Sequence, residues 1–218
     1  YVGVYGGLIA RDEVQQFIND SDCLLILGSI LSDLEDLNAD SPLRSEGRTI
    51  HATADHVSIR HHRYDTIRFQ DFVQALGTLG LSTQSSRPLP PPLSITGPPP
   101  APDSQVTLRG LFGHLDQKLD QTTLVIADVG ESLFAAADLR VHRRFEFLSP
   151  AYYTSMGFAV PASIGASFAD PTLRPIVLVG DGAFQMTGTE LSTSVRLGLK
   201  PFVLVLNNEG YGTMRKIR

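Results

Sequence analysis

Residues 175–211, PIVLVGDGAFQMTGTELSTSVRLGLKPFVLVLNNEGY, decide the fold of this chain. Within this stretch, residues 176–179 and 202–206 are continuous apolar runs, typical of buried parallel strands. A helix is expected between them, because Thr187 and Glu190 have the spacing of a capping box. The order strand, helix, strand predicts a right-handed β-α-β unit and therefore an α/β fold.

Polar residues follow both predicted strands at the point where each strand ends. The first strand is followed by Gly180-Asp181-Gly182 and the second by Asn207-Asn208. Ligands bind at the carboxyl edge of open parallel sheets, so these residues are expected to form one site. Asp181 and Asn208 offer the oxygen ligands that Mg²⁺ prefers.

The backbone next to Asp181 also suits a phosphate group. Gly180 and Gly182 allow an anion to approach the main chain closely, and the free N–H groups of Ala183 and Phe184 come just before the predicted helix. The sequence therefore predicts a magnesium and diphosphate site. Taken separately, Gly180-Asp181-Gly182 could equally well be a plain turn, and Asn207-Asn208 a strand-end cap.

The two motifs, with a strand, a helix and a strand between them, resemble the thiamin diphosphate signature of 2-oxo acid decarboxylases, acetolactate synthases and their relatives. The sequence of residues 180–211 is most similar to the indolepyruvate, phenylpyruvate and pyruvate decarboxylase branch. The resemblance implies that Asp181, Asn208 and the carbonyl of Gly210 bind Mg²⁺. It also implies a lyase that converts a 2-oxo acid to an aldehyde without oxidation, with thiamin diphosphate as cofactor.

The resemblance extends to two earlier segments, residues 128–132 and 151–157. It places Val129, Gly130 and Glu131 beside the aminopyrimidine ring of the cofactor. In the later segment, the Thr154 carbonyl is implied to accept a hydrogen bond from the 4′-amino group, and Met156 to support the junction of the two rings. From the residues alone, ordinary core packing is the favoured interpretation of Met156.

Proline marks the domain boundary. Residues 83–104 and their flanks are rich in proline, which lacks an N–H group and fixes φ, so this segment is expected to be a connector or, alternatively, an SH3-type ligand. Residues 1–82 resemble part of the middle domain of the same decarboxylases. Residues 105–218 resemble their thiamin diphosphate-binding domain, incomplete at its C-terminus. The fold expected is two three-layer α/β units with parallel sheets.

Periodicity gives the other elements of the two units. In the first, helices are expected at 12–19 and 70–79 and strands at 23–27, 49–52 and 66–69. In the second, a helix is expected at 106–119, with Leu108 among its inward residues, and strands at 122–127 and 145–148. A further helix of small residues follows Gly157, with Pro161 in its first turn.

Composition and charge limit the classes of partner that we expect this protein to bind. A net charge of −5 and a pI near 5.6 argue against nucleic acid, and the sequence has no apolar stretch of membrane-spanning length. Cys23, the single cysteine, is expected in the core of a protein from a reducing compartment, hence cytoplasmic. The spacing of His51, His56, His61 and His62 does not match zinc patterns, so a solvated or interface cluster is favoured.

Some features depart from the resemblance. Met214 stands where pyruvate and indolepyruvate decarboxylases have a catalytic glutamate. The tail of residues 211–215 is instead similar to branches such as phenylpyruvate or benzoylformate decarboxylase, so the resemblance favours an aromatic substrate, such as phenylpyruvate or indolepyruvate, over small aliphatic ones. The activating glutamate of the family is expected outside this chain, so the catalytic residues are unknown and the chain alone is expected to be inactive. The resemblance implies a homodimer or homotetramer. An acetolactate synthase-like carboligase and a non-catalytic cofactor-binding paralogue remain alternatives.

Overall fold

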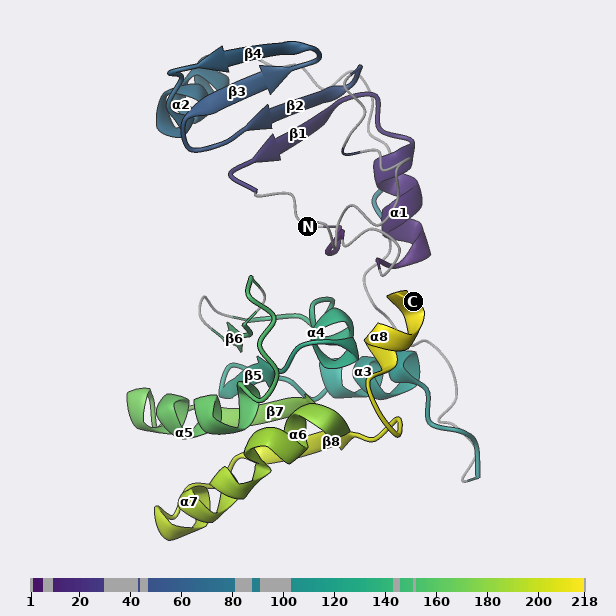
Figure 1. The fold of residues 1–218 in the computed structure, drawn as a ribbon, viewed down its shortest axis with the longest axis vertical. Helices are drawn as coiled ribbons and strands as arrows, with labels where there is room; N and C mark the ends of the chain where they lie inside the picture. Colours follow the sequence, from purple (N-terminus) through teal and green to yellow (C-terminus); the bar gives the residue numbers. More distant parts are fainter. Residues whose placement is uncertain are drawn as a thin grey trace. The chain divides into compact units, whose positions relative to one another are not determined.

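The computed structural model describes residues 2–5, 10–29, 43, 47–80, 88–90, 103–142, 146–150 and 152–217, excluding the side chains of residues 216 and 217. The chain divides into two compact units, Tyr1–Pro92 and Leu93–Arg218 (Figure 1). Most of the predicted connector, residues 83–104, lies outside the described residues. Within the described residues, no helix is both long and apolar enough to span a bilayer.

The first unit is a four-stranded sheet in the order β1-β2-β3-β4 with two helices. Strands β1 and β2 are parallel, whereas β3 pairs antiparallel with both β2 and β4. The elements are α1 (Asp12–Asn19), β1 (Leu24–Leu27), β2 (Thr49–Ala52), β3 (His56–Ile59), β4 (His62–Asp65) and α2 (Phe69–Thr78). The bounds of both helices and of the first two strands differ from the predicted bounds by at most one residue.

Two expectations for the first unit are wrong, and one hairpin was missed. Residues 66–69 are not a strand, because Thr66 has a φ of 73° and α2 already begins at Phe69. The β3–β4 hairpin was not expected. Cys23 is exposed and does not lie in the core, which here includes Val14 and Val57, each 1% exposed.

The second unit is a wholly parallel sheet in the order β6-β5-β7-β8, which confirms the predicted α/β class. Helices connect the strands, as the crossover between parallel strands requires. The elements are α3 (Leu108–Asp116), β5 (Thr123–Ala127), α4 (Glu131–Ala136), β6 (Phe147–Leu148), α5 (Ala159–Ala169), β7 (Arg174–Gly180), α6 (Asp181–Thr187), a 3₁₀ turn (Gly188–Glu190), α7 (Leu191–Arg196), β8 (Phe202–Leu206) and α8 (Gly212–Ile217).

Apolar side chains on both faces of this sheet make it the middle of three layers. Successive residues of a strand point to opposite faces. Leu178 of β7 therefore joins a cluster with Phe112 of α3, whereas its neighbours Val177 and Val179 join a cluster with Val160 of α5. All four of these β7 and α5 residues are fully buried, but Leu108 of α3 is 37% exposed, contrary to the prediction.

The connection between β7 and β8 differs from the prediction at its start. Helix α6 begins directly at Asp181, and Thr187 does not cap a helix; its hydroxyl donates to the carbonyl of Gly157 at 2.9 Å. The predicted capping box is therefore wrong. The end of the connection is as predicted, because Gly198 has a φ of 68° after α7 and Leu199 N–H donates back to the Ser194 carbonyl at 2.9 Å.

Candidate functional site

A buried carboxylate at the end of β5 organises one side of the site. Asp128 is fully buried, and its Oδ2 accepts from Ala159 N–H at 2.9 Å. Its Oδ1 accepts from Gly157 N–H at 3.1 Å and from Val129 N–H at 3.0 Å. These bonds fix the start of α5, and the loop before it, at the carboxyl edge of the sheet.

Gly157 also ties this loop to α6. Its φ is 85°, a conformation that side chains disfavour. A Cβ at this position would lie 3.1 Å from Thr187 Cγ2 and 3.2 Å from Met186 Cβ, so the backbone of the loop lies directly against the end of α6. The hydrogen bond from the Thr187 hydroxyl closes the same contact.

Asp181 lies at the carboxyl end of β7, where this strand pairs with β8. Gly180 is in register with Leu206, so Asp181 and Asn207 leave the sheet side by side. Asp181 is half-buried, and no hydrogen bond reaches its carboxylate from any described residue. A half-buried carboxylate without a partner is costly unless a cation or water satisfies it.

The segment after β8 folds back over α6 and α4. The ring of Tyr211 covers Gly182 so closely that a Cβ there would be 2.6 Å from Tyr211 Cε1. Asn208 Nδ2 donates to Glu131 Oε2 of α4 at 2.8 Å. Because the carboxylate can only accept, this bond identifies Nδ2 as the amide donor and leaves Asn208 Oδ1 as an acceptor.

The remaining candidate ligand, the Gly210 carbonyl, lies in the same turn. It accepts from Gly212 N–H at 3.0 Å, which uses one of its two lone pairs. The turn is held by Arg215, whose Nη2 donates to the Glu209 carbonyl at 2.6 Å. Asp181, Asn208 and Gly210 thus come from two neighbouring strand ends of one sheet.

Part of the second unit is similar to a known family of protein domains. Residues 128–217 match the family model of the thiamine pyrophosphate enzyme C-terminal TPP binding domain. Every residue of the site described above lies within the matched range. This part of the second unit is therefore similar to the thiamine pyrophosphate binding domain of that family. Thiamin diphosphate is therefore the cofactor of the second unit.

Curated relatives of the whole chain are decarboxylases. Indole-3-pyruvate decarboxylase of Azospirillum brasilense is 34% identical over 98% of this chain and 39% of that protein. Pyruvate decarboxylase isozyme 1 of Saccharomyces cerevisiae is 30% identical over 100% of the chain and 39% of that protein. An alpha-keto-acid decarboxylase of Mycobacterium ulcerans is also 30% identical, over 38% of its length. The chain thus spans about two fifths of these relatives.

The residues at the edge of the sheet fit thiamin diphosphate and a divalent cation. The Asp181 carboxylate and Asn208 Oδ1 are hard oxygen ligands without a hydrogen-bonded partner among the described residues. A Cβ at Gly180 would meet no atom within 4 Å, so the main chain there is open to a ligand. The side chains of Ala183 and Phe184 pack in the core, so only their N–H groups can serve an anion.

Thr154 and Met156 lie on the loop that Asp128 holds, and both side chains are exposed. Met156 is 40% exposed, so the core-packing interpretation is wrong for the described structure. Thr154 has a φ of 55° and its N–H donates to the Pro150 carbonyl at 2.8 Å. No hydrogen bond among the described residues joins this loop to Asp181 or Asn208.

Sequence reasoning missed the role of Asp128. A carboxylate directly after the apolar run 124–127 is a signal that could have found it, because a buried charge needs several donors. Its donors, Gly157 and Ala159, are 29 and 31 residues away in the sequence, so the pairing itself has no local pattern.

Proposed function

We propose that this chain is part of a thiamin diphosphate- and Mg²⁺-dependent enzyme for the non-oxidative decarboxylation of a 2-oxo acid, with an aromatic substrate favoured. The observation that carries the proposal is the half-buried Asp181 carboxylate, which has no hydrogen-bond partner among the described residues. It lies at the end of β7, next to the end of β8, the strand that Asn208 follows. The names of the relatives, which include indole-3-pyruvate and pyruvate decarboxylases, support the reaction class.

In this proposal the cation is held by the Asp181 carboxylate, Asn208 Oδ1 and the Gly210 carbonyl. The second lone pair of the Gly210 carbonyl remains for the metal beside its bond to Gly212 N–H. Together with the metal, the diphosphate would be held by the N–H groups of Ala183 and Phe184 in the first turn of α6, by the open backbone at Gly180 and by the main chain of Gly182, whose Cβ position Tyr211 covers. Glu131 supports the set indirectly by fixing Asn208.

Other residues of the chain position the opposite end of the cofactor. Bound thiamin diphosphate supplies a nucleophilic carbon and an electron sink for the loss of CO₂. Gly130, Glu131, Thr154 and Met156 are the proposed contacts of its ring systems. Asp128 holds the Thr154 and Met156 loop through Gly157, so this loop keeps one geometry before the cofactor arrives. No described residue is assigned a proton-transfer step.

Binding calorimetry tests the site directly. We expect thiamin diphosphate to bind the chain with Mg²⁺ and to bind much more weakly without it. Asp181→Asn keeps the shape of the side chain but removes its charge, so metal-dependent binding should be lost. Glu190→Gln, in the 3₁₀ turn after α6, is the matched control and should bind as the natural chain does. Equal binding by all three proteins would refute the metal assignment.

Product analysis tests the reaction. A protein that contains these residues and matches the full length of the relatives is expected to release aldehyde from phenylpyruvate or indolepyruvate faster than from pyruvate. The preference is motivated by Met214, which is 51% exposed on α8 beside the proposed metal loop. Formation of a carboligation product from two oxo acids would instead select the acetolactate synthase-like alternative. Tight cofactor binding without turnover would select a non-catalytic paralogue.

The proposal includes assembly as a homodimer or homotetramer, in which a second subunit completes the cofactor site. We expect the 218-residue chain alone to bind thiamin diphosphate without releasing aldehyde. The motivating observation is that the chain covers 39% of the length of its relatives. Aldehyde release by the purified chain would contradict this expectation, and a monomeric, active full-length protein would contradict the assembly.

A further inference from the structure

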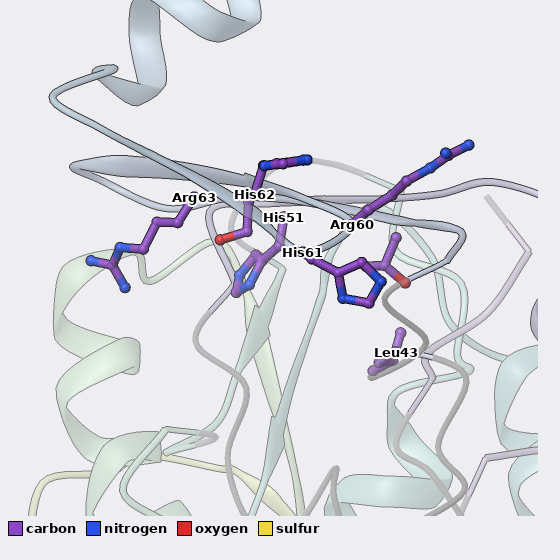
Figure 2. A pocket seen from close by; sticks show the side chains of 8 residues that line it. Leu43, His51, Arg60, His61, His62 and Arg63 are labelled. Carbon is purple, nitrogen blue, oxygen red and sulfur yellow. The ribbon is translucent and has the colours of Figure 1, made fainter.

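The guanidinium of Arg215, in α8, bonds to the main chain of residues 207–210, the proposed metal loop. Its Nη2 donates to the Glu209 carbonyl at 2.6 Å. Arginine often pairs with a carboxylate instead. Arg63, which lines a pocket of the first unit (Figure 2), does so, because its Nε donates to Asp65 Oδ1 at 2.7 Å. The contact of Arg215 with a carbonyl therefore needs an explanation in the loop itself.

The turn at residues 209 and 210 has a backbone conformation that needs support. Glu209 has a φ of 59°, in the left-handed region that side chains disfavour, and Gly210 has a φ of 137°. The Glu209 N–H donates to Asn207 Oδ1 at 3.1 Å, and the Glu209 carbonyl accepts from Arg215. The peptide groups on both sides of Glu209 are therefore held, although the conformation between them is unfavourable.

Arg215 also lies directly against Gly210. A Cβ at Gly210 would be 2.7 Å from Arg215 Nη2. The peptide group that joins Glu209 to Gly210 is planar, so a bond at the Glu209 carbonyl fixes the plane from which Gly210 continues. The Gly210 carbonyl comes one peptide group later and accepts from Gly212 N–H at 3.0 Å. The guanidinium thus helps to set the direction of the carbonyl that is the proposed metal ligand.

Contacts with α4 seat the first turn of α8 independently of this guanidinium. A Cβ at Gly212 would lie 3.2 Å from Glu131 Cδ, and a Cβ at Gly130 would lie 3.2 Å from Thr213 Oγ1. The backbone at the start of α8 therefore lies directly against the start of α4. Arg215 projects from a helix that already has a fixed position, so its side chain can hold the loop in one geometry.

We propose that Arg215 is a positioning residue for the divalent cation, acting through the Glu209 carbonyl on the Gly210 carbonyl. This inference rests on the proposed function, because it requires Gly210 to bind the metal. The positive charge of Arg215 repels a cation, so its contribution to metal binding is made through the geometry of the turn. Removal of the side chain should therefore lower the affinity for Mg²⁺, whereas the loss of charge alone would raise it.

Calorimetric titration with Mg²⁺ of the 218-residue chain, in the same excess of thiamin diphosphate throughout, is the first test. Arg215→Met keeps a long side chain and a good helix former but removes the donor. It should weaken Mg²⁺ binding about ten- to a hundredfold, the loss typical when a residue that orients a metal ligand is removed. Arg215→Lys keeps a donor and should recover part of this loss. Arg196→Met, at the exposed end of α7, is the matched control and should bind as the natural chain does.

A second readout needs neither metal nor cofactor. In the metal-free chain, Arg215→Met should shift the amide resonances of Glu209 and Gly210 and accelerate hydrogen exchange at Glu209, whereas Arg196→Met should do neither. Unchanged loop amides in Arg215→Met, or an affinity for Mg²⁺ that is unchanged or higher, would overturn this inference alone. Absence of Mg²⁺-dependent binding by the natural chain would overturn the proposed function and this inference with it.

Discussion

Replacing the buried carboxylate of Asp128 should loosen the loop that carries Thr154 and Met156. Asp128→Ala removes the acceptor of two buried N–H groups, those of Gly157 and Ala159. Each buried donor left without a partner costs about 1–3 kcal/mol, so we expect a loss of roughly 2–6 kcal/mol in the free energy of unfolding. Asp128→Asn places an amide donor against one of these N–H groups and should cost about 1–3 kcal/mol.

Urea unfolding of the whole chain measures the total loss, and hydrogen exchange of the Gly157 and Ala159 amides locates it. Asp116→Asn is the matched control, because Asp116 is 3% exposed and accepts from the Arg140 backbone N–H at 2.7 Å. It should destabilise the chain without accelerating exchange at Gly157. If the exchange of both loop amides is unchanged in Asp128→Asn, the carboxylate does not hold the loop and the reasoning is wrong.

Three further predictions concern single residues. Gly157→Ala should cost about 1–2 kcal/mol in a urea melt because of its positive φ, whereas Gly165→Ala, in α5 with open space around its Cβ, should gain about 0.5–1 kcal/mol. The hydrogen bonds from Thr122 lower the pKa of Asp120. The stabilising contribution of Asp120 is therefore present above about pH 4 and is lost as the pH falls through the lowered pKa. In melts at a series of pH values, Asp120→Asn should flatten the fall in stability at acid pH. Asn208→Asp should weaken cofactor binding by about tenfold in calorimetry, because it sets a second carboxylate against Glu131. This loss is expected although Asp is itself a good Mg²⁺ ligand. Unchanged affinity would refute the positioning role of Glu131.

The parallel strands of the second unit could be predicted because their apolar runs are continuous and end at polar residues. Residues 123–127 are all buried, so the run in the sequence and the strand in the structure coincide. The β3–β4 hairpin could not be predicted in this way. Strand β4, with the sequence HRYD, is exposed along its whole length and has no apolar face to recognise.

The candidate site, too, could be predicted from the sequence only in part. The proposed metal ligands Asp181 and Asn208 follow strand ends, which are local features, and the pairing of Gly180 with Leu206 places the two strand ends at neighbouring positions. The capping box failed because the Thr187 hydroxyl bonds to Gly157, a partner 30 residues away. Asp128 was missed for the same reason. Side-chain hydrogen bonds over such separations depend on tertiary packing, which the local pattern does not contain.

The central claim is that this sheet edge holds the diphosphate of thiamin diphosphate through a metal, and amide chemical-shift mapping tests it most directly. Millimolar protein reveals even weak binding. The account predicts that thiamin diphosphate with Mg²⁺ shifts the amides of Gly180, Gly182, Ala183 and Phe184 and those of residues 208–210, and that omitting Mg²⁺ or introducing Asp181→Asn abolishes the shifts. Shifts that persist in Asp181→Asn, or that lie outside these two segments, would contradict it.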